Sequence, residues 1–208
     1  MEALAQEMVY ARRRRRERRR LKDLDDLALL RGWGRGQRAF ILGNGASLLT
    51  QDLSALHGEV TFTMNWFNRV ENRQNLQPTF HCMADKPETL QPFFNGMVED
   101  LDPQFFILDS ESNLLARELI STREARVLGI NSHLTWRSYA RVGDGCLSRG
   151  MPPCRTTALM ALMVAVHCQF SHIYLLGFDH DWLAVPPYVD SISDLRAYRH
   201  AYEDRIGV

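Results

Sequence analysis

One pattern recurs along most of the chain: a short apolar run of strand length ends at a polar residue or a glycine, and a stretch able to form a helix follows. Alternation of this kind is typical of an open parallel sheet whose strands are connected by helices. We therefore predict an α/β, Rossmann-like fold with a mostly parallel sheet and helices on both faces. The predicted strands are residues 40–42, 60–64, 79–84, 105–108, 126–130 and 173–177.

The first apolar run leads into a glycine-rich turn. Gly43, Asn44 and Gly45 follow it directly, and the two glycines let the backbone approach a ligand more closely than a Cβ would allow. If Ser47 caps the next helix, backbone amides and the positive helix end face one point, which suits a phosphate. Leu48 stands where a dinucleotide fingerprint has its third glycine, and no P-loop lysine follows. The turn predicts a nucleotide contact, with a tight turn that binds nothing as the alternative.

Polar side chains follow the other predicted strands as well. With the turn residue they form the set Asn44, Asn65, Asp85, Ser110 and Asp179. Ligands of doubly wound folds bind beyond the carboxyl ends of the strands, so we expect these side chains to converge on one nucleotide site. For any single member the simpler explanation is that Asn and Asp suit turns.

A buried helix is predicted between residues 155 and 170, where nearly every face is apolar. Either Thr156 or Thr157 can supply its N-cap. Arg155 lies at the helix start, where it is placed to bind a phosphate or a carboxylate through two hydrogen bonds. We count Thr156 among the nucleotide contacts, and a structural salt bridge is the alternative for Arg155.

The segment Asp179-His180-Asp181 is a candidate metal site, because two carboxylates flank one residue at a predicted strand end. Oxygen ligands suit Mg²⁺ or Mn²⁺, and such an ion would bridge the phosphates of a nucleoside diphosphate sugar or of ATP. The alternative is a turn in which Asp179 binds neighbouring backbone and Asp181 faces solvent.

Residues 1–37 are predicted to form an extension, a basic helix followed by a glycine-rich linker, and residues 38–208 the nucleotide-binding domain. Arginines fill positions 12–16 and 18–20, although 25 Lys and Arg balance 25 Asp and Glu over the whole chain. Charge alone would suit an anionic membrane surface or a nucleic acid. We favour a solvated helix or one that contacts a partner at its surface, and place nucleic acid last.

The cysteines and the apolar runs indicate the cellular compartment of the protein. Cys82, Cys146, Cys154 and Cys168 show no Cys-x-x-Cys spacing and no zinc-finger histidines, which argues against a disulfide framework or a structural zinc site. No apolar run reaches about 20 residues, and no apolar segment follows the basic block as a signal peptide would require. A cytoplasmic location is the expectation.

Several segments together carry a resemblance to known proteins. They are Gly-Asn-Gly-Ala-Ser-Leu at 43–48, Phe-Thr-Met-Asn at 62–65, Phe-His-Cys-Met-Ala-Asp at 80–85 and the helix and strand at 155–181. In this order they resemble the DUF115 family, which takes in proteins similar to archaeal 6-hydroxymethylpterin pyrophosphokinase (MptE-like) and to flagellin-modifying motility accessory factors. They also resemble bacterial sialyltransferases of the Campylobacter type.

The resemblance implies a Rossmann-like domain that binds a nucleotide or a nucleotide sugar. It implies nucleotide contacts from Asn44, Asn65 and Ser110, with Arg155 near the acceptor or the phosphate. The sialyltransferases carry a catalytic histidine in a lid segment beyond this helix and strand, and His200 is the candidate for it in this sequence. The chain ends soon after it, so the lid is expected to be truncated.

The chain also departs from the sialyltransferase pattern. Ala46 replaces the usual proline of the turn, and Asp85 stands where those enzymes have Asn. Asp181 falls where they place a phosphate-binding tyrosine, for which Tyr188 is a candidate substitute. These departures leave open which donor the chain would use and whether it needs a metal.

We expect a glycosyltransferase-like enzyme that takes a nucleotide sugar and a glycan acceptor in surface polysaccharide or glycoconjugate synthesis. In the expected displacement, His200 is the general base, and Arg155 with the loop amides stabilises the departing phosphate. One alternative is a pyrophosphokinase that uses ATP and magnesium. Another is a nucleotide-binding or scaffolding protein without activity.

Overall fold

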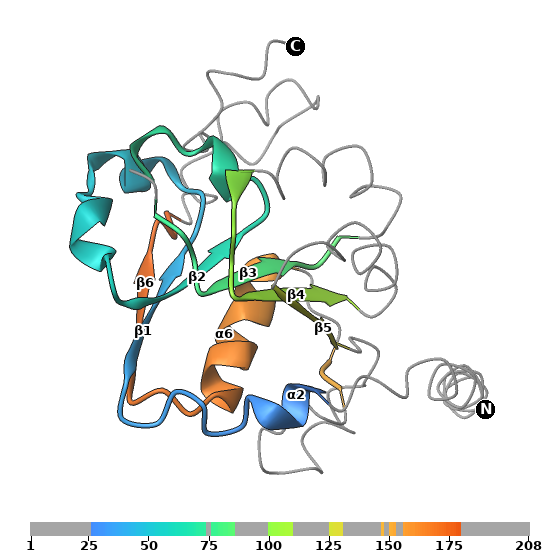
Figure 1. Ribbon diagram of the computed structural model, residues 1–208. Helices are drawn as coiled ribbons and strands as arrows, with labels where there is room; N and C mark the ends of the chain where they lie inside the picture. The colour runs from blue at the N-terminus through green and yellow to red at the C-terminus, as the bar shows by residue number, and fades with distance from the viewer. Residues whose placement is uncertain are drawn as a thin grey trace, which may run out of the picture.

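The computed structural model describes residues 26–73, 76–85, 100–109, 125–130, 147, 150–152 and 156–179. Within these ranges a six-stranded sheet has the order β5-β4-β3-β2-β1-β6, and every neighbouring pair is parallel (Figure 1). The strands are β1 (Arg38–Leu42), β2 (Val60–Met64), β3 (Phe80–Met83), β4 (Phe105–Asp109), β5 (Arg126–Ile130) and β6 (His172–Leu176). The predicted α/β, Rossmann-like fold is confirmed.

The strands form where the sequence has uninterrupted apolar runs, because a parallel sheet covered on both faces buries both sets of alternating side chains. Every residue of β3 and of β4 is buried. Three aromatic rings stack across the middle of the sheet. The ring centroids of Phe62 and Phe80 are 4.3 Å apart, and those of Phe80 and Phe105 are 4.9 Å apart. Offset stacking of this kind stabilises the strand register in addition to the area buried.

One face of the sheet carries the two α-helices of the described ranges. The helix α6 (Thr157–His167) packs against β1, β2 and β3, and Thr156 caps it by accepting a hydrogen bond from the Leu159 amide at 3.2 Å. The predicted buried helix and its threonine cap are thus confirmed. The short helix α2 (Asp26–Leu29) packs against β5, and Leu27 and Leu30 are buried in the same core. The end of the predicted extension therefore contributes to the core, whereas residues 1–25 lie outside the described ranges.

The opposite face is covered by short 3₁₀ helices. They are η1 (Ala46–Thr50), η2 (Leu53–Leu56), η3 (Phe67–Arg69) and η4 (Glu71–Arg73). Their apolar side chains, among them Leu48, Leu53 and Phe67, form a second core with Leu42, Phe106 and neighbours. Helices therefore flank both faces, as predicted, although the described ones on this side are 3₁₀ rather than α.

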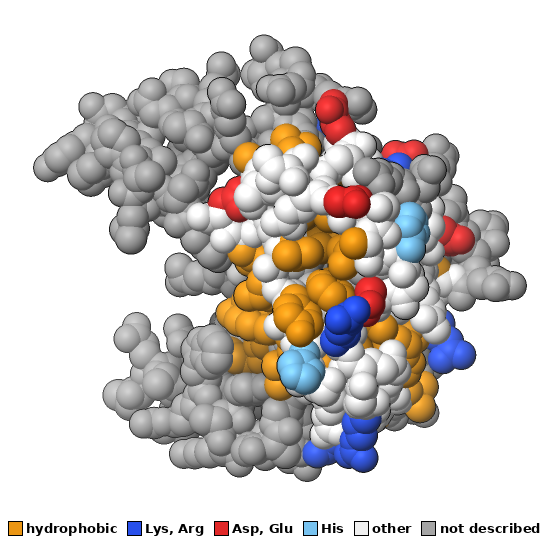
Figure 2. Space-filling model, turned by 90° about the vertical axis from the view of Figure 1, so that its left-hand side faces the viewer, with side chains coloured by type: hydrophobic (Ala, Val, Ile, Leu, Met, Phe, Trp, Pro, Cys, Tyr) orange, Lys and Arg blue, Asp and Glu red, His pale blue; other side chains and the backbone are white. Residues whose placement is uncertain are grey.

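The strand order reverses between β1 and β6. From β1 the chain proceeds through β2, β3, β4 and β5 in one direction, and β6 then pairs with the free side of β1. Two large hydrophobic side chains of β6, Tyr174 and Leu175, are 44% and 49% exposed. Figure 2 shows hydrophobic side chains gathered on the side of the molecule that carries β1 and β6.

None of the described helices is long and apolar enough to span a membrane.

Candidate functional site

The turns after β1 and β6 meet at the carboxyl end of the sheet, where the strand order reverses. The Gly43 amide donates to Leu176 O at 2.8 Å, and the Gly45 amide donates to Gly177 O at 2.9 Å. A Cβ on Gly43 would stand 2.3 Å from Gly177 O, and one on Gly45 would stand 2.6 Å from the Asp179 carboxylate. We call these contacts the glycine junction. The turns after β1 and β6 come so close together there that neither position 43 nor position 45 has room for a Cβ, which explains why both residues are glycine.

The Asp179 side chain closes the glycine junction. Its Oδ2 accepts a hydrogen bond from the Ser47 amide at 2.8 Å, and its Oδ1 accepts one from the Ser47 hydroxyl. The expectation that Ser47 caps a helix is wrong, because Ser47 lies inside η1, whose N-cap is Gly45 and which has no side-chain cap. The Ser47 amide, which was expected to face a phosphate, donates to the Asp179 carboxylate instead. The partial positive charge of a backbone N–H favours an anionic partner of either kind.

These hydrogen bonds also bear on the predicted metal site. Each carboxylate oxygen of Asp179 already accepts one hydrogen bond from Ser47. Asp181 lies outside the described residues. Within the described part of the chain, no three His, Cys, Asp or Glu side chains form a group that could hold a metal ion. A metal ion at Asp179 and Asp181 therefore stays a prediction, and it would have to share Asp179 with Ser47.

Asn44 connects the first two strand ends. Its Nδ2 donates to Met64 O at the end of β2 over 3.0 Å, which fixes the orientation of the carboxamide, since a carbonyl accepts only from a donor. Its Oδ1 is buried and has no hydrogen-bond partner among the residues that the structure describes. A buried acceptor without a partner costs free energy, so this oxygen favours any ligand or water that donates to it.

Asn65 connects the end of β2 to α6 and to the end of β3. Thr157 Oγ1 accepts from the Ala84 amide at 3.4 Å and donates to Asn65 Oδ1 at 3.0 Å. The carboxamide is thereby oriented with Nδ2 as its remaining donor, for which the described residues offer no partner. Asn65 thus presents two N–H groups at the carboxyl end of the sheet, next to the segment that ends in Asp85.

A buried histidine lies beneath this arrangement. His81 Nδ1 is 2.8 Å from Thr63 Oγ1, and the Thr63 hydroxyl also lies 3.5 Å from Phe80 O, to which it can donate. Burial lowers the pKa of His81 to about 3, so the imidazole is neutral at physiological pH. Sequence reasoning missed His81 as a site residue, although a histidine inside a fully apolar strand is itself a signal that a buried partner exists.

The structure brings together only part of the predicted site. Gly43, Asn44, Gly45, Ser47 and Asp179 meet in and around the glycine junction, and Asn65 is joined to Asn44 through the end of β2. Asp85 is exposed and follows Ala84, and Thr156 acts as the cap of α6. The predicted residues Ser110, Arg155, Asp181, Tyr188 and His200 lie outside the described ranges.

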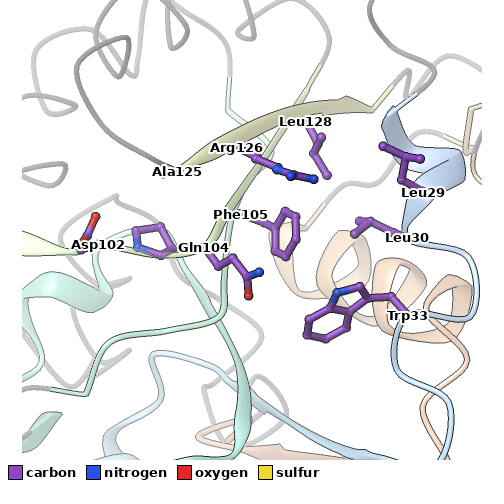
Figure 3. A pocket seen from close by; sticks show the side chains of 10 residues that line it. Leu29, Leu30, Trp33, Asp102, Gln104, Phe105, Ala125, Arg126 and Leu128 are labelled. Carbon is purple, nitrogen blue, oxygen red and sulfur yellow. The ribbon is translucent and has the colours of Figure 1, made fainter.

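A cavity of about 690 Å³ lies at the other end of the sheet, near the amino ends of β4 and β5 (Figure 3). Its wall combines the apolar side chains of Trp33, Phe105 and Leu128 with the polar side chains of Gln104 and Arg126. This position is away from the strand ends at which ligands of doubly wound folds bind. We therefore place the candidate site at the polar carboxyl end and not in the cavity.

Comparisons with known proteins give one structural likeness. No protein-family model and no curated protein matches this sequence. Among solved structures, a MAf glycosyltransferase from Magnetospirillum magneticum matches with a TM-score of 0.50 and 18% sequence identity. The match covers 74% of this chain and 27% of that protein, so this chain spans about a quarter of its length. The likeness supports a glycosyltransferase-like fold, and membership of the DUF115 family stays a prediction.

Proposed function

We propose that this chain is a glycosyltransferase-like protein that binds a nucleotide sugar at the carboxyl end of its sheet. The observation that carries the proposal is the pair of oriented asparagines at the ends of adjacent strands. Asn44 offers an acceptor and Asn65 offers donors, and neither group has a partner among the described residues. A nucleotide presents both kinds of group on its base and its ribose. The glycosyltransferase-like fold of the structural neighbour supports the proposal.

The chemistry that we propose is displacement at the anomeric carbon of the sugar by a hydroxyl of a glycan acceptor. In this proposal His200 removes the proton of that hydroxyl as general base. Arg155, with Ser110, Thr156 and Tyr188 as further contacts, stabilises the negative charge on the departing phosphate. The arginines at 12–20 would add a peripheral contact with an anionic membrane or a protein partner.

Calorimetric titration of CMP, UDP and ATP, each with Mg²⁺ and with EDTA, tests the binding step. We expect one nucleotide to bind, and Asn65→Ala to weaken it about tenfold, the effect of one lost hydrogen bond of about 1.4 kcal/mol. Gln37→Ala is the matched control, because it removes a carboxamide from the amino end of the sheet, where the Gln37 side chain donates to Trp33 O. Equal losses in the two variants would contradict the proposed site.

The same titration separates the alternatives that the sequence leaves open. Nucleoside diphosphates that bind only with Mg²⁺, and lose this dependence in Asp181→Asn, would support a metal at Asp179 and Asp181 and bring a pyrophosphokinase back into consideration. Binding that is unchanged by EDTA would remove the metal from the proposal. Absence of binding under every condition would contradict the enzyme proposal and favour a scaffolding protein.

A further inference from the structure

We propose that Arg69, stacked on Trp66, is a phosphate-binding residue of the candidate site. This role rests on the proposed function, because the phosphate is that of the nucleotide at the carboxyl end of the sheet. Inorganic pyrophosphate tests the cation without the base and the sugar, so the two proposals can fail separately.

The 3₁₀ helix η3 brings the two side chains together. Trp66 is its N-cap, and Arg69 is its last residue, whose amide donates to Trp66 O at 2.9 Å. In a 3₁₀ helix, side chains three positions apart lie above one another. Arg69 therefore covers Trp66, with its Cζ 4.0 Å from the centroid of the indole ring. The same spacing places Phe67 and Val70 together in the core.

The stacked pair lies beside the asparagines of the candidate site. Trp66 is the residue after Asn65, and neighbouring Cα atoms are about 3.8 Å apart. The segment is also fixed on its other side, because Asn72 Nδ2 donates to Leu48 O at 2.8 Å and to Gln51 O at 2.9 Å. These two acceptors belong to η1 and its C-cap. The segment that carries Arg69 thus connects the end of β2 to the turn after β1.

Arg69 carries a charge that the described residues do not neutralise. Apart from the indole of Trp66, its guanidinium has no hydrogen-bond or ion-pair partner within the described ranges. Arg38 is a useful contrast, because its Cζ also lies over an aromatic ring, that of Phe40, at 5.5 Å. The Nε of Arg38 donates to Glu59 Oε2 at 3.0 Å, so that charge is compensated within the protein. The charge of Arg69 remains available to a ligand.

The neighbouring charged groups have other partners. Asp100 Oδ2 accepts from Asn68 Nδ2 at 3.2 Å, and Asp100 O accepts from Arg73 at 3.4 Å. Neither Asp100 nor Glu71, the other carboxylate of this segment, forms an ion pair with Arg69 in the described part of the chain. Both carboxylates oppose an anion, so a bound phosphate has to be held by direct contact with Arg69 and not by the overall charge of the surface.

A guanidinium stacked on an indole suits a phosphate. Stacking occupies the flat face of the group and leaves the N–H donors at its edge, where they match two oxygens of a phosphate. Because Trp66 already restricts the Arg69 side chain, less conformational entropy is lost when the phosphate binds. Asn44 and Asn65 offer groups that suit the base and the ribose, and Arg69 supplies the cation that these neutral side chains lack.

The test compares each nucleotide with its nucleoside by calorimetric titration of the whole chain: CMP with cytidine, UDP with uridine and ATP with adenosine. In Arg69→Gln, affinity for the nucleotide should fall about thirtyfold, the effect of a lost charge-assisted contact, and affinity for the nucleoside should stay unchanged. Arg69→Lys keeps the charge without the planar fork and should lose less. Arg38→Gln is the matched control and should change neither affinity.

Trp66→Leu tests the support of the guanidinium. It removes the ring and leaves the charge, so nucleotide affinity should fall about fivefold, while nucleoside affinity stays unchanged. The double variant Trp66→Leu, Arg69→Gln should bind the nucleotide no more weakly than Arg69→Gln, because Trp66 acts through Arg69. Additive losses in the double variant would contradict this positioning role of Trp66.

Equal losses for nucleotide and nucleoside in Arg69→Gln, or no loss for either, would overturn the inference. If the wild type binds none of the three nucleotides, the proposed function fails, and ³¹P NMR titration with inorganic pyrophosphate decides the role of Arg69. Pyrophosphate should then bind the wild type and Arg38→Gln but not Arg69→Gln. In that case, absence of pyrophosphate binding to the wild type, or equal binding to Arg69→Gln, would overturn the inference.

Discussion

The two halves of the candidate site are built in different ways. In the glycine junction, two backbones approach so closely that only glycine fits at Gly43 and Gly45, and one carboxylate holds the Ser47 segment. In the second half, which we call the asparagine relay, Asn65 Oδ1 accepts from Thr157, and Thr157 accepts from the Ala84 amide. There the side chains span the distance between the segments. The glycine junction depends on the absence of side-chain atoms, whereas the relay depends on particular polar atoms being present and correctly oriented.

This difference predicts different responses to mutation. An added atom in the glycine junction meets backbone, which cannot move without shifting β1 or β6. A lost atom in the relay leaves a buried polar group without its partner, while the surrounding backbone can stay in place. Mutations in the glycine junction should therefore mainly lower the free energy of unfolding, whereas mutations in the relay should mainly change the geometry of the site.

Gly45→Val should give the largest effect, a loss of about 3 kcal/mol of unfolding free energy, because its Cβ would stand 2.6 Å from Asp179 and 2.7 Å from Gly177 O. The φ of Gly45 is −69°, so the loss comes from contact and not from backbone strain. Gly58→Ala is the control, with strain at φ +81° and open space around the new atom, and should cost about 1 kcal/mol. Urea unfolding that ranks the two variants in the reverse order would contradict the close approach.

The buried imidazole of His81 predicts a pH dependence of stability. The folded pKa of His81 is lowered to about 3 from 6.5, so between these values the unfolded chain binds a proton that the folded chain excludes. Stability from this group is complete above pH 6.5 and falls by about 1.4 kcal/mol for each pH unit below it. His81→Gln should remove this contribution. Chemical unfolding between pH 4.5 and 7 measures it, and identical slopes in the variant and the wild type would contradict a buried neutral His81.

The fold could be predicted from the sequence more fully than the site. Apolar runs determine where parallel strands form, and Thr156 after a proline pair indicates where α6 begins. The close approach at Gly45 could not be predicted, because its partner Asp179 lies far along the chain and local patterns do not report pairing at that separation. The direction of Asn65 could not be predicted either, since it depends on a single left-handed residue that breaks the strand alternation.

Asp179→Ala should cost about 1 kcal/mol, since its hydrogen bonds to Ser47 are charge-assisted but exposed. Asp52 offers a matched control, because its carboxylate also accepts from the amide and the hydroxyl of one serine, Ser54, two residues away. Hydrogen exchange should accelerate at the Gly45 and Ser47 amides in Asp179→Ala and stay unchanged there in Asp52→Ala. Equal exchange in both variants would mean that Asp179 does not hold the two turns together.

The smallest expected effect is the energetic coupling between the glycine junction and the asparagine relay. Gly45→Ala perturbs the first and Thr157→Val the second, and no described hydrogen bond joins the two directly. Their stability losses should therefore add within about 0.5 kcal/mol. Asn44 connects the two regions through Met64 O, so any coupling beyond that limit should disappear when both variants are made in an Asn44→Ala background.

Ligand affinity in the same proteins tells which region the nucleotide contacts. A nucleotide that contacts both regions should lose affinity in Gly45→Ala and in Thr157→Val, and the two losses should add if the regions are independent. Titration of the nucleotide that binds the wild type, alongside urea unfolding of each variant, provides both cycles. Unchanged affinity in Gly45→Ala, beside a loss in Thr157→Val, would place the nucleotide on one region only, and would separate the glycine junction, as a purely structural contact, from the asparagines that bind the ligand.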